Sequence, residues 1–138
     1  MTPSLLAQLK NLLTKYVLSG EKELQTITRG VLESWGSVPN EVTASTATTL
    51  IDLNLSPFVV INLQESTTLS FTGSQTGVYV LKIKQGSVGS KTITWPSNIK
   101  WPEATEPTLT TTANAWDFVT LVYDGTYFSG TSTLNFVA

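Results

Sequence analysis

The sequence contains no cysteine and no histidine. Without a thiol or an imidazole, the chain cannot build a disulfide, a zinc cluster, a Cys-His pair or a Ser-His-Asp triad. Charge is scarce too, because only 13% of the 138 residues are charged, eight of them basic and ten acidic. Nucleic-acid binding needs a concentrated basic face, so this balance argues against it. We therefore expect no catalytic site of these classes, no metal, no cofactor and no nucleic-acid partner.

Long apolar runs are also missing. Polar residues interrupt the most apolar stretch, 5–17, at Gln8, Lys10, Asn11 and Lys15. No run reaches the length that crosses a bilayer, and the first residues lack the cationic start of a signal peptide. The sequence predicts neither membrane insertion nor a targeting segment.

Uncharged hydroxyl groups take the place of charge. Thr and Ser supply roughly a quarter of the chain, about the share that charged residues have in an average protein. The chain also holds four Trp, four Tyr and five Phe at a net charge of −2, which is not the composition of a disordered protein. The sequence predicts a folded domain.

The composition changes near residue 40, where Pro39 forces Val38 out of the helical region of backbone space. Residues 1–38 carry a helical period, and residues 42–138 are rich in Thr, Val and aromatic residues with a period of two. We expect an N-terminal α-helical segment for oligomerisation or attachment over 1–38, and a β-domain over 42–138.

Apolar residues in the first region recur at helical spacing and predict helices over about 3–18 and 21–34, either separate or joined across Gly20. Such helices are too apolar to be stable alone in water, so they must pack on something. Either the β-domain or further copies of the segment can cover them, and we favour a short bundle of copies. The predicted oligomerisation residues are Leu5, Leu9, Leu12, Tyr16, Leu24, Ile27 and Val31.

The second region consists of short β-branched and aromatic runs separated by turn residues. Runs at intervals near ten residues predict an antiparallel β-sandwich or a jelly-roll-like domain. Asp124-Gly125 predicts a hairpin with a two-residue loop, and Lys82 and Lys84 are typical of a protected edge strand. The predicted strands span 48–53, 58–63, 67–71, 77–84, 91–95, 115–123 and 126–129.

Two of these runs, 78–84 and 116–123, are apolar on both faces. A strand of that kind is covered twice, once in the sandwich and once by another layer. A domain of this size has no further layer of its own to cover the second apolar face. We therefore expect a neighbouring subunit to cover it.

The runs 91–102 (KTITWPSNIKWP), 107–112 (PTLTTT) and 116–128 (WDFVTLVYDGTYF) carry a resemblance. With their two Trp-Pro pairs and Thr run, they resemble the C-terminal β-domain of phage tail fibres and of some capsid decoration proteins. Glu103-Ala104 stands where that pattern has two glycines, and Ala113-Asn114 where it has one. The resemblance implies a homotrimeric, β-rich virion component on a tail or capsid, without catalytic activity.

The two Trp-Pro pairs, Trp95-Pro96 and Trp101-Pro102, suit strand ends and sheet edges because proline offers no ladder donor. Their rings can cap the core, or they can stack on sugars of the host surface. Trp95, Trp101 and Tyr127 are the candidate glycan-binding residues.

The carboxylates are sparse. Glu103 with Glu106, or Asp117 with Asp124, could serve as a glycosidase pair only if a cleft raised the pKa of one partner. We interpret them as ordinary turn and surface residues.

Three functions follow from these patterns. The first is a non-enzymatic, trimeric tail-fibre subunit attached through its N-terminal helices, with other virion proteins and a host glycan as partners. The second is a capsid decoration (cement) protein of the same fold, and the third is a carbohydrate-binding module or glycan hydrolase.

Overall fold

The computed structural model describes Leu5, Gln8 and residues 38–138. The predicted helices therefore lie outside the described residues, as do all the predicted oligomerisation residues except Leu5. Residues Val38–Ala138 form one compact unit. In the part that is described, no helix is long and apolar enough to cross a membrane.

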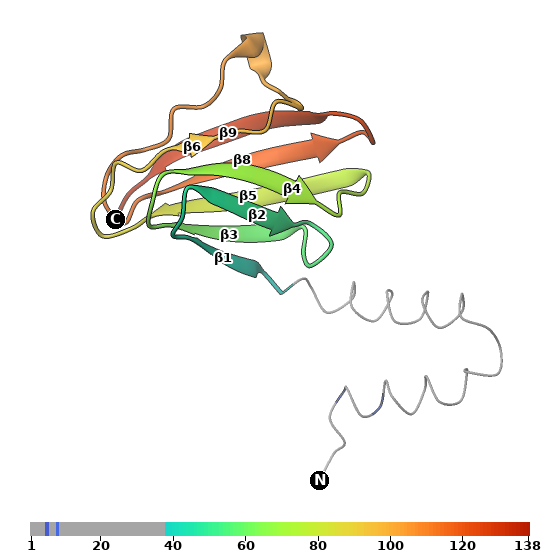
Figure 1. Cartoon of the computed structure of the whole chain (residues 1–138), viewed down its shortest axis with the longest axis horizontal. Coiled ribbons are helices and arrows are strands. Elements are labelled where there is room, and N and C mark those ends of the chain that lie inside the picture. Colours follow the sequence, from blue (N-terminus) through green and yellow to red (C-terminus); the bar gives the residue numbers. More distant parts are fainter. Residues whose placement is uncertain (1–4, 6–7, 9–37) are drawn as a thin grey trace, which may run out of the picture. The chain divides into compact units, whose positions relative to one another are not determined.

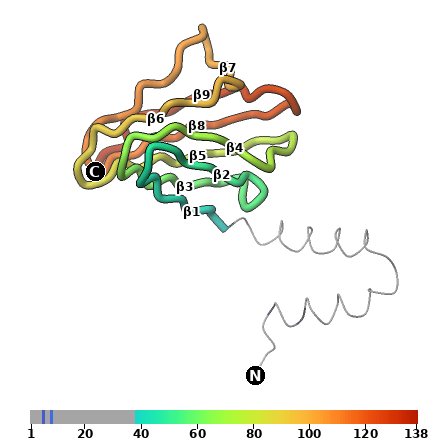
Figure 2. Tube along the Cα trace, in the orientation of Figure 1, coloured from blue at the N-terminus to red at the C-terminus, as the bar shows by residue number. Residues whose placement is uncertain are grey.

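Residues 38–138 form nine strands in two facing sheets (Figures 1 and 2). The larger sheet has the order β1-β3-β5-β8-β9-β7 and the smaller has the order β2-β4-β6. The strands are β1 (Asn40–Ala44), β2 (Thr48–Asp52), β3 (Phe58–Leu63), β4 (Thr67–Thr72), β5 (Gly77–Gln85), β6 (Ile93–Thr94), β7 (Ile99–Lys100), β8 (Trp116–Tyr123) and β9 (Phe128–Phe136).

The first six strands wind as a short β-solenoid. The chain alternates between the sheets, and each strand pairs in parallel with the strand two positions along the chain. Asn40 pairs with Val59 and Phe58 with Val80, so one turn of the winding advances 19 and then 22 residues. Parallel pairing needs a long crossover, and the intervening strand of the other sheet provides it.

The prediction of an antiparallel sandwich is therefore wrong for most of the domain. Within residues 38–138, only β5, β8 and β9 pair antiparallel. Consecutive short strands with alternating burial arise both from hairpins and from a winding that changes sheet at every turn, because both geometries bury every second side chain. The mainly β class is confirmed.

The β8–β9 hairpin is confirmed, but its loop holds four residues rather than two, since Tyr123 pairs with Phe128. The Oδ1 atom of Asp124 accepts hydrogen bonds from the backbone N–H groups of Thr126 and Tyr127, at 2.8 and 2.7 Å. These bonds organise the longer loop and lower the pKa of Asp124, the bond from Tyr127 contributing most.

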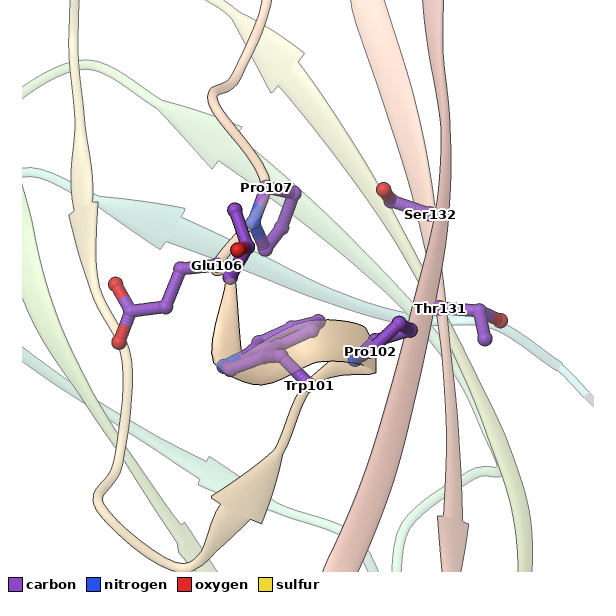
Figure 3. Close-up of a pocket in the computed structure, with 7 residues that line it drawn as sticks. Trp101, Pro102, Glu106, Pro107, Thr131 and Ser132 are labelled. Atoms are coloured by element: carbon purple, nitrogen blue, oxygen red, sulfur yellow. The ribbon is translucent and has the colours of Figure 1, made fainter.

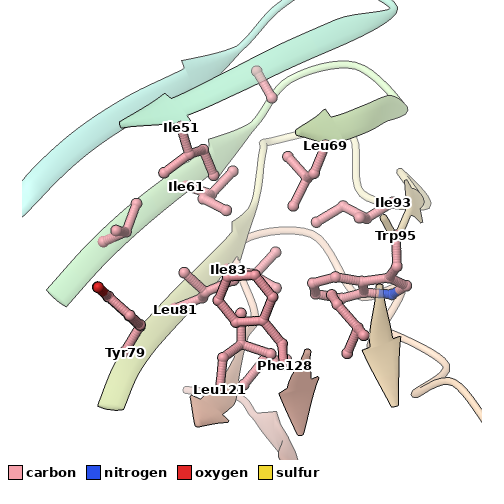
Figure 4. Packing of buried hydrophobic residues seen from close by; sticks show 14 of the residues in the cluster. Ile51, Ile61, Leu69, Tyr79, Leu81, Ile83, Ile93, Trp95, Leu121 and Phe128 are labelled. Carbon is pink, nitrogen blue, oxygen red and sulfur yellow. The ribbon is translucent and has the colours of Figure 1, made fainter. Parts of the chain in front are cut away.

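The core lies between the sheets (Figure 4). Parallel register stacks apolar residues of successive turns, such as Val59 on Leu81 and Ile61 on Ile83. Phe128 is the largest fully buried side chain among the described residues, and its ring centre lies 4.4 Å from that of Tyr123 and 5.3 Å from that of Phe71. The turn corners are also packed, because a side chain at Gly73 (φ +70°) would collide with Asn54 of the preceding turn.

The other face of the larger sheet, which we call the outer face, is partly apolar. Val78 and Val122 pair directly across β5 and β8 and are 55% and 48% exposed. Lys82 and Lys84 also lie here, and the prediction that they protect an edge is wrong, because β5 is flanked by β3 and β8. Instead, the Lys82 ammonium lies 4.5 Å from the centre of the Trp116 ring.

Candidate functional site

The two Trp-Pro pairs end two edge strands, as their chemistry predicts. Trp95 follows β6 and Trp101 follows β7, which are edge strands of the smaller and larger sheets. Trp95 is only 6% exposed and belongs to the core, so its ring offers almost no face to a sugar. Trp101 is half-buried and packs edge-on to Trp95, with ring centres 5.1 Å apart.

The indole ring of Trp101 packs closely against the backbone of β9 at Gly130. A β-carbon at that position would stand 2.5 Å from Cζ3 of Trp101. A side chain at this position would displace the ring, so glycine at position 130 is what allows the indole ring to pack here. The outward part of the ring is left as one wall of a hollow.

This hollow, the Trp101 pocket, has a volume of about 350 Å³ and lies between β9 and the loop that follows β7 (Figure 3). In the view of Figure 3 the side chain of Ser132 points toward the loop, while that of Thr131 points away from it. The pocket combines an aromatic surface with the Ser132 hydroxyl, which is chemistry that suits a neutral sugar, whereas the Glu106 carboxylate points away from β9 in Figure 3. Its lining includes Trp101, Pro102, Thr105, Glu106, Thr131 and Ser132.

The loop that forms one wall of the Trp101 pocket begins with a single 3-10 turn, Pro102–Ala104. Glu103 and Ala104 both adopt left-handed backbone angles, with φ of 54° and 56°. These are the two residues that stand in the place of glycines, and each costs about 1–2 kcal/mol in this conformation. Hydrogen bonds from Ala104 N to Trp101 O and from Thr105 N to Pro102 O, each 3.0 Å, hold the turn.

Tyr127 lies on the β8–β9 hairpin loop and is 45% exposed. The ammonium group of Lys100 lies 4.7 Å from the centre of its ring. The structure thus brings Trp95 and Trp101 into contact, places Trp101 at a pocket, and leaves Tyr127 as a separate exposed aromatic residue.

Asp117 and Asp124 do not have the spacing of a glycosidase pair. Asp117 and Asp124 are separated by seven residues along β8 and the start of its loop, roughly 20 Å at strand spacing, whereas the two acids of a glycosidase stand about 5–10 Å apart. Glu103 and Glu106 are both exposed. Among residues 5, 8 and 38–138, no three His, Cys, Asp or Glu side chains gather as a metal site.

A buried polar cluster at Thr110 was missed by sequence reasoning. Asp117, only 2% exposed, accepts hydrogen bonds from Thr110 N (2.7 Å), Thr110 Oγ1 (2.6 Å) and Asn135 N (2.8 Å). Gln85 donates to Thr110 O at 2.9 Å. The signal was available, because Asp117 occupies an inward position of its strand between the buried residues Ala115 and Val119.

The family described as "Putative phage tail fibre C-terminal domain" matches residues 38–127. The chain belongs to this family of tail-fibre domains. The match spans β1 to β8 and includes Trp101, whereas Thr131 and Ser132 of the Trp101 pocket lie beyond it. Searches of curated proteins and of solved structures each found no match.

Membership in the tail-fibre family confirms the resemblance read from the Trp-Pro and Thr motifs. The protein is a phage structural protein located in the virion, at the tail fibre. A component of that kind makes contacts with other virion proteins.

Proposed function

We propose that the protein is a non-enzymatic subunit of a homotrimeric tail fibre, in which residues 1–38 join three chains to the tail and the β-domain faces the host. Family membership is the observation that carries the proposal. The tail-fibre assignment is also favoured over capsid decoration, because the family description names the tail fibre alone.

A trimer explains the exposed apolar part of the outer face. Val78 and Val122 form a patch on adjacent strands, and water contact with two half-exposed valines is unfavourable. A second copy of the same domain, equally poor in charge, is a partner of suitable chemistry. The apolar stripe that includes Leu9 and Leu12 would add a second contact between chains.

Particle labelling tests the location. Gold-labelled antibody against this chain is expected to mark the distal tail of intact virions in electron micrographs. Signal over the whole shell would refute the tail assignment and support a capsid decoration protein.

Light scattering tests the assembly. Three times the 15.0 kDa chain mass is expected at micromolar concentration, and a monomer would refute the trimer. Substituting Leu9→Asp and Leu12→Asp should release monomer or cause aggregation, and an unchanged mass would show that the β-domain alone holds the chains together.

We further propose that the Trp101 pocket contacts a neutral glycan of the host surface. On a glycan array, hits are expected to weaken in Ser132→Ala and Trp101→Phe, with thermal unfolding as a check that both variants are folded. Tyr127→Ala tests the hairpin in the same way. Hits that none of the three changes alters, or no hits at all, would leave this part of the domain with a structural role only.

A further inference from the structure

A second hollow lies on the outer face of the larger sheet, at the end of β5 that is remote from Val78. This hollow, the Lys84 pocket, has a volume of about 380 Å³, within the range of small-ligand sites. Three separate segments contribute to it: β3 and the turn after it, the end of β5, and the residues that lead into β8. Its lining includes Asn62, Gln64, Lys84, Ser87, Asn114 and Trp116.

The backbone around the Lys84 pocket is fixed by hydrogen bonds. Gly86 N donates to Leu63 O at 3.0 Å, and Asn114 N donates to Gly86 O at 3.2 Å. At the end of β5, the side chain of Gln85 points inward and is hydrogen-bonded to the backbones of Lys91 and Thr110. The walls of the pocket are therefore held independently of any ligand.

Five polar side chains at the pocket have no hydrogen-bond partner among residues 5, 8 and 38–138. Gln85 also lines the pocket, but its side chain is hydrogen-bonded to Lys91 and Thr110, whereas the other polar side chains there make no hydrogen bond within the described part of the chain. Together they offer three amides, a hydroxyl and an ammonium group to a single hollow. They are Asn62, Gln64, Lys84, Ser87 and Asn114.

The charge of the pocket is positive although the domain is acidic. Residues 38–138 contain four lysines and seven carboxylates. Lys91 pairs with Glu65 at 3.2 Å, whereas neither Lys82 nor Lys84 has a carboxylate within ion-pair distance among the residues that the structure places. Lys82 lies over the Trp116 ring, so two unpaired cations flank one aromatic side chain of the pocket.

We infer that the Lys84 pocket binds an anionic sugar, a hexose ring that carries a carboxylate or a phosphate. Lys84 pairs with the anionic group, the amides and Ser87 bind ring hydroxyls, and Trp116 supplies an apolar wall. The number of neutral hydrogen-bonding groups exceeds what a simple anion can use, which favours a sugar over a free ion. The inference rests on the proposed function in one respect only, the origin of the sugar, which would be an acidic polysaccharide of the host surface.

Titration of the ¹⁵N-labelled full chain, followed by NMR, tests the site. D-Glucuronate and glucose 6-phosphate are expected to shift the resonances of Asn62, Lys84 and Asn114 saturably, more weakly at high salt, whereas D-glucose at the same concentration should not. Lys84→Met should weaken binding about tenfold or more, the loss expected for one hydrogen bond to a charged group. Lys100→Met removes a lysine at the Tyr127 ring and should leave the affinity unchanged.

Several outcomes would overturn the inference. Equal binding of D-glucose would remove the role of charge, and equal binding of inorganic phosphate would remove the role of the sugar. Shifts confined to residues 101–107 would place the ligand in the Trp101 pocket, and an unchanged affinity in Lys84→Met would refute the site. Particle labelling does not depend on the sugar, so a failure of the proposed function and a failure of this site are distinguishable.

Discussion

Replacing Asp117 tests whether the buried cluster at Thr110 stabilises the domain. The carboxylate is 2% exposed, and its three hydrogen bonds join the segment before β8 to the end of β9. In Asp117→Ala the backbone N–H group of Thr110 loses its acceptor. The backbone N–H group of Asn135 still has an acceptor, the hydroxyl oxygen of Thr110, at 3.0 Å. The substitution therefore leaves one backbone donor without a partner.

The magnitude follows from those bonds. A hydrogen bond to a charged group contributes about 1.5–3 kcal/mol, and an unsatisfied donor costs about 1–3 kcal/mol. Removing a buried charge recovers part of its desolvation cost. We expect Asp117→Ala to lower the free energy of unfolding by about 3 kcal/mol, a large part of the 5–15 kcal/mol typical of a domain. Thr110→Val, which removes only the hydroxyl, should cost about 1 kcal/mol.

Urea unfolding of the full chain, at one fixed concentration and monitored by tryptophan fluorescence, measures these losses. Thr111→Val is the matched control, because Thr111 is exposed and its hydroxyl makes no hydrogen bond within the described residues. The control should change stability by less than about 0.5 kcal/mol. If Asp117→Ala costs no more than Thr111→Val, the cluster does not stabilise the fold and the reasoning is refuted.

Three further changes test the packing and the hairpin. Gly130→Ala should cost about 1–3 kcal/mol and alter tryptophan fluorescence, because the new methyl group displaces Trp101; an unchanged spectrum would contradict the contact. Phe128→Ala should cost about 3–5 kcal/mol in urea unfolding, and a loss below 1 kcal/mol would show that the core adapts. The lowered pKa of Asp124 means that its carboxylate stabilises the fold above the ordinary aspartate pKa near 3.9. This contribution is lost as pH falls through the lowered value, so the difference in urea midpoint between the protein and Asp124→Asn should shrink below about pH 4. A difference that does not vary with pH would contradict the capping role.

The positions of strands could be predicted from sequence, but their partners could not. The predicted run 58–63 coincides with β3, and 48–53 differs from β2 by one residue. β1 was missed because Asn40, Glu41 and Thr43 interrupt its apolar pattern at the edge of the sheet, and the two-residue β7 leaves no periodic signal. Alternating burial fixes which side chains point inward, not whether the chain reverses at a turn or crosses to the other sheet.

The candidate sites could not be predicted fully either, because they too depend on which strands pair. Trp95 and Trp101 share one local motif, yet one ring is buried and the other lines a pocket, because burial depends on the strands that each ring meets. The Lys84 pocket is still less visible in the sequence. Asn62, Lys84 and Trp116 come together only because Asn62 and Lys84 pair across β3 and β5, and Lys84 pairs with Trp116 across β5 and β8.

The two ends of the outer face should act independently. Val78 and Lys84 point to the same side of β5 and are six residues apart, roughly 20 Å at strand spacing. That distance exceeds the range over which substitutions couple, and it exceeds the Debye length of about 8 Å at physiological salt. Val78→Asp should therefore change the mass of the assembly but not the affinity for glucuronate, and Lys84→Met should do the opposite. A change of both properties by either substitution would mean that the anion site is completed by a neighbouring chain rather than by one domain.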